Sequence, residues 1–96
     1  MNITDVQIHL VHDDAKLKAY VAVIIDDSFV IKDMKVIQGN NGVFVAMPNK
    51  KGKDGIYRDI AHPINADTRK SFEATILNAY REAVAQEGAS GNTQAS

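Results

Sequence analysis

Four basic residues lie close together in one short segment: Lys50, Lys51, Lys53 and Arg58. Asp54 is the only acidic residue among them. Flexible lysine ammonium groups neutralise phosphates and release counterions, which gives affinity with little sequence information. The planar arginine guanidinium can bind a phosphate or a guanine edge through two parallel hydrogen bonds. The segment therefore predicts a polyanion site. The alternative is a solvated hairpin tip, in which lysines keep an edge from aggregating.

Burial cannot explain this basic loop, because no apolar residue occurs between Pro48 and Ile56. Apolar strands are predicted on either side of it, over residues 43–47 and 56–61. The turn at residues 39–42 is rich in glycine and asparagine and suits a hairpin. Pro48 ends the first strand, since proline cannot donate to a ladder. We therefore expect a cationic finger held by two strands.

The histidines do not form a convincing catalytic or metal site. His62 lies near Arg58 and Asp59, but no Ser or Cys stands at nucleophile spacing. Since a residue before proline is held extended, we expect His62 to hydrogen-bond the backbone where the last strand turns towards the helix. The spacing of His9 and His12 does not make a pocket by itself. The sequence predicts no enzyme, no cofactor, no metal and no small-molecule substrate.

Composition limits the chain to one small domain. It has 96 residues, 45% of them hydrophobic, no cysteine and a net charge of −1. Disulfides and thiolate metal sites are thereby excluded. The first residues do not resemble a signal peptide, and the longest apolar run is too short to span a bilayer. We therefore expect a cytoplasmic protein without a membrane partner, whose positive charge is local rather than general.

The periodicity of the chain predicts an α+β domain, a small antiparallel sheet of about five strands followed by a C-terminal helix. Besides the two strands named above, alternation predicts strands over residues 6–10 and 17–25. A third strand is expected over residues 29–37. The alternation of apolar and polar residues in this strand is interrupted near Lys32 and Asp33. This interruption indicates a bulge, with a short helical turn as the alternative.

The helix should begin at Asn65, a good N-cap residue. Its apolar stripe is predicted to comprise Phe72, Ile76, Leu77, Ala79, Tyr80, Ala83 and Val84. It should end near Glu87 and Gly88, which gives a folded domain over residues 1–87 and a disordered tail over residues 88–96. Arg69, Lys70 and Arg81 read as a solvated outer face, or alternatively as a second phosphate-contacting surface.

A second apolar face is predicted on the strand at residues 17–25. Tyr20, Ala22 and Ile24 share it, and one small sheet cannot easily cover it. A chain of this length buries only about 60–65% of its unfolded surface and is marginal alone. We therefore expect a homodimer that pairs edge strands or stacks these faces.

Two ungapped blocks resemble a known family. GNNG followed by VFVAMP, then a basic loop, then YRDIAHPIN, is similar to the SpoVG family of bacterial sporulation and septation regulators. The likeness runs from Thr4 to about Tyr80, which is most of the chain. Family members usually carry a Lys-Arg-Thr-Pro-Asp-Gly-type loop, whereas this chain has KGKDG. The loss of an arginine and a proline implies a more flexible loop here.

The resemblance implies a dimeric regulator that binds DNA or RNA through the basic loop and the neighbouring helix. Carried onto this sequence, the expected contacts are Lys50, Lys51, Lys53, Arg58, Arg69 and Lys70. A protein–protein adaptor that acts at septation, with the lysines merely solvating the loop, is the alternative function.

Overall fold

The computed structural model describes the backbone of residues 2–94 and the side chains of residues 2–87. Six strands precede one helix. Their bounds are β1 Ile3–Leu10, β2 Leu17–Ile25, β3 Phe29–Gly39, β4 Gly42–Ala46, β5 Asn49–Lys51, β6 Tyr57–Asp59 and α1 Ala66–Gln94. The predicted α+β order of strands followed by one helix is confirmed. The bounds of β2 are those predicted, and β1 begins three residues earlier than expected.

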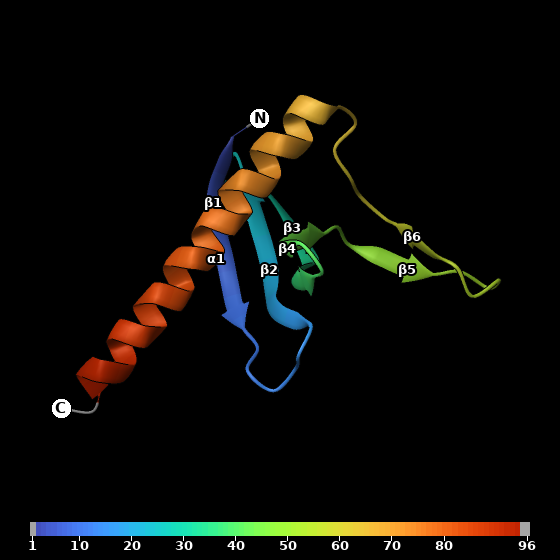
Figure 1. The fold of residues 1–96 in the computed structure, drawn as a ribbon. Coiled ribbons are helices and arrows are strands. Elements are labelled where there is room, and N and C mark those ends of the chain that lie inside the picture. The colour runs from blue at the N-terminus through green and yellow to red at the C-terminus, as the bar shows by residue number, and fades with distance from the viewer. Residues whose placement is uncertain (1, 95–96) are drawn as a thin grey trace.

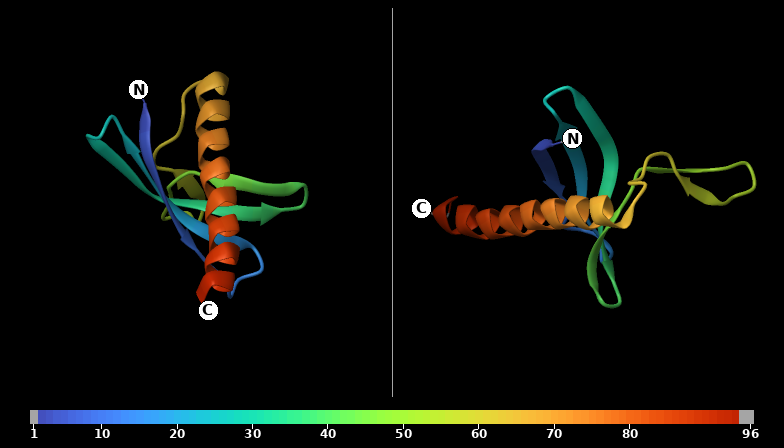
Figure 2. Two further views of the ribbon diagram at one scale, coloured as in Figure 1. Left: turned by 90° about the vertical axis from the view of Figure 1, so that its left-hand side faces the viewer. Right: turned by 90° about the horizontal axis from the view of Figure 1, so that it is seen from above.

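Strands β1 to β4 form one antiparallel sheet in sequence order (Figure 1). Alternation sends one set of side chains towards α1, which lies across that face of the sheet (Figure 2). The core lies between sheet and helix, and its fully buried members include Val23, Met34, Val36 and Ile76. Such a core is aliphatic, as expected from a chain with few aromatic residues.

The slip in period of the third strand is a bulge, as predicted. The pairing of β2 with β3 shifts register between Val21 and Val23, opposite Met34 and Ile31. Asp33 takes a left-handed conformation there, with a φ of 64°. The bulge lets Met34 and Ile31 both face the helix side, because the extra residue resets the alternation.

The helix begins as predicted and ends later. Asn65 caps it by accepting a hydrogen bond of 2.8 Å from the backbone N–H of Thr68. The predicted end at Glu87 and Gly88 is wrong, since the backbone stays helical to Gln94. Glycine inside a helix costs only about 1 kcal/mol, and each added turn of a formed helix gains hydrogen bonds. Residues 95 and 96 of the predicted tail lie outside the described residues.

The expected fifth strand does not join the main sheet. It spans only Tyr57–Asp59, and it pairs with β5, a strand that the sequence did not predict. The chain leaves the main sheet at Met47 and Pro48, where proline removes a ladder donor. The polar stretch after it then pairs with the returning chain. A two-stranded hairpin, rather than a loop between two sheet strands, therefore carries the basic residues.

The sheet face away from the helix is partly apolar. Neighbouring positions on paired strands place Tyr20, Ile24, Val30 and Phe44 on this outer face. Tyr20, Val30 and Phe44 keep 46%, 49% and 45% of their surface exposed. Within the part of the chain that the structure describes, no helix is long and apolar enough to cross a membrane.

Candidate nucleic-acid interface

The basic residues lie on a projecting hairpin, which we call the arm and define as residues 49–59. The arm extends away from the sheet and helix, on the side opposite to the C-terminal end of α1 (Figures 1 and 2). Strands β5 and β6 pair with each other and with no strand of the main sheet. The arm is therefore free to enter a groove or lie along a backbone without moving the core.

Strand register distributes the cations over both faces of the arm. Lys50 lies opposite Arg58, and Lys51 lies opposite Tyr57. Successive side chains of a strand point to opposite faces, so Lys50 and Lys51 project on different sides. Lys53 lies in the turn at the tip. All three lysines are exposed.

Arg58 is already paired within the arm. Its Nη2 donates to Oδ2 of Asp54 over 2.7 Å, and its Nη1 donates to Oδ1 over 3.3 Å. The hydrogen bonds from Arg58 and from the Ile56 N–H lower the pKa of Asp54 below its ordinary value. The two side chains thus form a bidentate pair, in which two nitrogens of the Arg58 guanidinium bind the two carboxylate oxygens of Asp54. The partner is Asp54 and not the neighbouring residue Asp59.

Backbone bonds order the tip of the arm. The N–H of Gly52 donates to Ile56 O over 2.8 Å, and the N–H of Gly55 donates to Gly52 O over 3.0 Å. Gly55 has a φ of 82°, which favours glycine. A Cβ on Gly52 would lie 2.8 Å from both Arg58 Nη1 and Asp54 Oδ1. These contacts shape the turn at the tip without the family's proline, and the greater flexibility expected from its loss stays a prediction.

The helix cations occupy a separate element. Arg69 and Lys70 lie in the first two turns of α1, near the end that the chain reaches from the arm (Figure 1). Arg69 is half-buried and Lys70 is exposed. Arg81 lies farther along the helix and donates to the side-chain oxygen of Asn78 over 3.3 Å. The arm projects away from the body, so these residues form a second basic surface rather than part of the arm.

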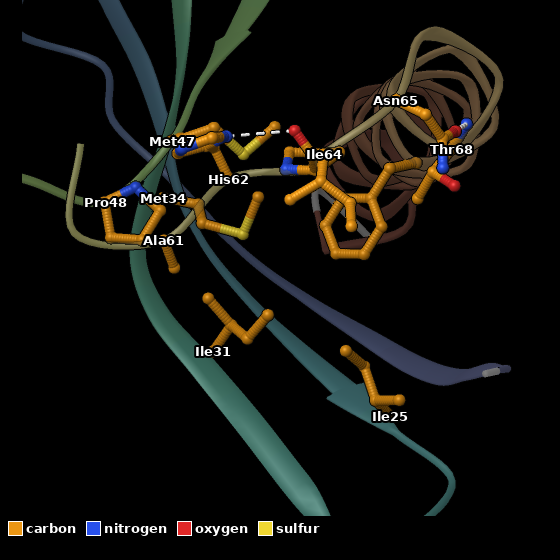
Figure 3. Close-up of a pocket in the computed structure, with 12 residues that line it drawn as sticks. Ile25, Ile31, Met34, Met47, Pro48, Ala61, His62, Ile64, Asn65 and Thr68 are labelled. Carbon is orange, nitrogen blue, oxygen red and sulfur yellow. Dashed lines mark hydrogen bonds between the residues drawn. The ribbon is translucent and has the colours of Figure 1, made fainter.

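Residues 60–65, which we call the connector, join the arm to α1 over an apolar groove. This groove has a volume of about 410 Å³ and lies between the connector, the sheet and the start of the helix (Figure 3). Ile31, Met34 and Phe72 line it from the sheet and helix sides. Ile64, which also lines it, keeps 91% of its surface exposed. The sequence did not predict this groove, because its walls come from segments far apart in the chain.

Two histidines, His62 and His12, make contacts that hold segments of the chain together. Nδ1 of His62 donates to the Pro63 carbonyl over 2.9 Å, which confirms the predicted backbone contact (Figure 3). His12 lies 3.0 Å from a carboxylate oxygen of Glu87 and ties the β1–β2 turn to the far part of the helix. No sequence pattern links residues 75 positions apart, so this contact could not be predicted.

Comparison with known proteins agrees with the two sequence blocks. The family model described as SpoVG matches residues 1–82. A Myxococcus xanthus protein named "Putative septation protein SpoVG" is 60% identical over 80 residues, which are 83% of this chain and 80% of that protein. Proteins of the same name from Lachnospira eligens and Thermoanaerobacter sp. are 51% identical over 83 residues and 48% identical over 89 residues. These matches cover 86% and 93% of this chain, and 94% and 97% of the two relatives.

Proposed function

Because this chain belongs to the SpoVG family, we propose that it is a regulatory protein that binds nucleic acid through its arm. One observation carries the proposal. Lys50, Lys51 and Lys53 project from an ordered hairpin that stands clear of the body. Among the described side chains, the salt bridges involve none of these three lysines. Three unpaired ammonium groups on an extended support are suited to phosphates, which supply the sequence-independent part of nucleic-acid affinity.

The arm is shaped for a groove or a backbone rather than for base stacking. Its lysines lie on both faces and at the tip, so they can reach phosphates on either side of the arm. A two-stranded ribbon also fits the major groove of B-form DNA. Tyr57 is the only aromatic residue of the arm, which leaves little for stacking on single strands. Arg69 and Lys70 provide a second basic surface that a long nucleic acid can reach.

Salt dependence tests this function on the native protein. Binding to a short duplex DNA and to a single-stranded RNA is measured between low and physiological salt. Three phosphate contacts per chain predict a log–log slope of about −2.7 on duplex, or about −5.4 if a dimer uses both arms. An affinity that does not change with salt, or no binding at low salt, would reject the proposal.

A protein–protein adaptor at septation is the second candidate, and the apolar groove under the connector favours it. Two isoleucines of the connector, Ile60 and Ile64, keep 66% and 91% of their surface exposed, and Ile64 lines this groove. The names of the relatives refer to septation and not to a ligand. A largely apolar protein interface weakens little with salt, so the titration above separates the two functions.

We also propose that the chain acts as a homodimer through the outer face of the sheet. Tyr20, Val30 and Phe44 expose apolar surface there, opposite to the face that α1 covers. Gly39 leaves room for the Phe44 ring, because a Cβ at this position would lie only 3.1 and 3.2 Å from two of the ring carbons. A dimer carries two arms. Once one arm has bound a nucleic acid, the second binds at a high effective concentration, so the dimer binds more tightly than a single arm.

A further inference from the structure

The Asp54–Arg58 pair occupies the one guanidinium of the arm with a carboxylate. A phosphate group binds the same planar fork through the same two hydrogen bonds. We propose that Asp54 is an intramolecular competitor for phosphate, which holds Arg58 on the arm and limits the affinity for nucleic acid. This inference rests on the proposed function and assigns Asp54 a restraining role within it.

The contacts of Asp54 show how completely it engages Arg58. Oδ2 accepts from Nη2 of Arg58, and Oδ1 accepts both from Nη1 and from the backbone N–H of Ile56, over 3.1 Å. Gly52 lies directly against the pair: a Cβ there would lie 2.8 Å from Nη1 of Arg58 and from Oδ1 of Asp54, so one of the two side chains would have to shift. The arm is thus built around the pair, while the lysines remain outside it.

Exposure makes the pair exchangeable. The side chains of Arg58 and Asp54 keep 61% and 49% of their surface accessible. Exposed ion pairs contribute little, because water screens them and both side chains lose freedom in forming them. A row of phosphates beside Lys50 and Lys53 therefore competes with the carboxylate for the guanidinium. In the wild-type arm Asp54 keeps Arg58 from a full phosphate contact, so the arm gains less than a free arginine would give.

The test compares two variants with the same change of charge. Asp54→Asn keeps an Oδ1 acceptor for the Ile56 N–H and removes the charge that holds Arg58. Asp59→Asn is the matched control, because Asp59 is also exposed, lies on the same arm opposite Asn49, and makes no ion pair with Arg58. Both substitutions raise the net charge by one unit, but only Asp54→Asn removes the ion-pair partner of Arg58.

We expect Asp54→Asn to bind duplex DNA about two- to five-fold more tightly than Asp59→Asn, the range for one exposed charge pair. Its salt slope should steepen by about 0.9 per chain, the value for one added phosphate contact. The double variant D54N/R58Q should lose both gains, because they act through Arg58. Thermal melts accompany each measurement, to show that all variants are folded.

Equal affinities and slopes for Asp54→Asn and Asp59→Asn would overturn the inference, as would a gain that survives in the double variant. If the wild type shows a lysine-dependent slope while the two Asn variants agree, the restraining role fails and the proposed function stands. If the wild type binds no nucleic acid, both are overturned.

Discussion

Arg58 illustrates how one neighbour decides the role of a side chain. Its position after three lysines predicts a phosphate contact, and the family resemblance implies the same. The structure instead places its guanidinium on Asp54, which lies four positions before it across the turn. The sequence could not show that the turn at the tip of the arm directs the Asp54 carboxylate at Arg58. Among the described side chains, Lys50, Lys51 and Lys53 have no such acidic partner, so their charges are available for a ligand.

Replacing Arg58 with alanine should loosen the arm without unfolding the core. The guanidinium contacts the tip of the arm, and β6 pairs with β5 rather than with the main sheet. We expect faster amide exchange at Gly52 and Ile56 with an unchanged thermal melt. A melting temperature lowered by several degrees would instead tie Arg58 to the core.

Acid should release the same contact. The Arg58 hydrogen bond and the Ile56 N–H lower the pKa of Asp54 in the folded arm, so the bound carboxylate stabilises the tip above its unfolded pKa. That contribution is lost only as the pH falls below the ordinary value of 3.8 and through the lowered pKa. A carbon-detected titration of Asp54 should therefore show a midpoint below 3.8, the ordinary value for an aspartate. A midpoint at or above that value would contradict the pairing.

At the scale of elements, strong periodicity was predictive and weak periodicity was not. The alternation of residues 17–25 gave the bounds of β2, and the slip near Asp33 located a bulge. Asn65 marked the start of the helix. Strand β5 was missed because Asn49, Lys50 and Lys51 have no apolar face, and their pairing partner alone makes them a strand. The helix end was missed because glycine weakens a helix without necessarily ending it.

The stability of the protein should depend on Ile76, the buried side chain with which the helix packs against the sheet. Ile76 is fully buried against the strands, whereas Val84, two turns later, keeps 45% of its surface exposed. Ile76→Ala should cost about 2–5 kcal/mol of unfolding free energy, since it leaves a cavity. Val84→Ala is the matched control and should change stability by less than about 0.5 kcal/mol. Chemical denaturation of both variants measures the difference, and equal costs would mean that the helix packs differently.

At the scale of the molecule, charge and apolar surface are segregated. The net charge of −1 conceals an arm with four basic residues, and the outer face carries exposed aromatic residues on the opposite side of the sheet from α1. A folded body, a projecting basic arm and an apolar sheet face suit a small assembly in which several arms act together. Neither composition nor net charge could predict this segregation, because it depends on which strand leaves the sheet.

Sedimentation tests the assembly. A homodimer should sediment at twice the monomer mass of 10.5 kDa at micromolar concentration. Tyr20→Asp places a charge on the outer face and should shift the protein towards monomer. Phe29→Asp is the control, since Phe29 is more exposed but pairs with Ile25 on the helix side of the sheet. A wild type at the monomer mass, or a dimer disrupted only by Phe29→Asp, would reject the outer face as the interface.

Replacing the three arm lysines tests the central claim most directly. Lys50, Lys51 and Lys53 are changed together to glutamine, and the control changes Lys16, Lys18 and Lys32, which lie off the arm, in the same way. Both variants lose three charges, and both should melt like the wild type because no altered side chain belongs to the core. We predict that the arm variant loses about 2.7 units of salt slope per chain on duplex DNA, whereas the control keeps its slope. A folded arm variant that binds with unchanged affinity and slope would contradict the account.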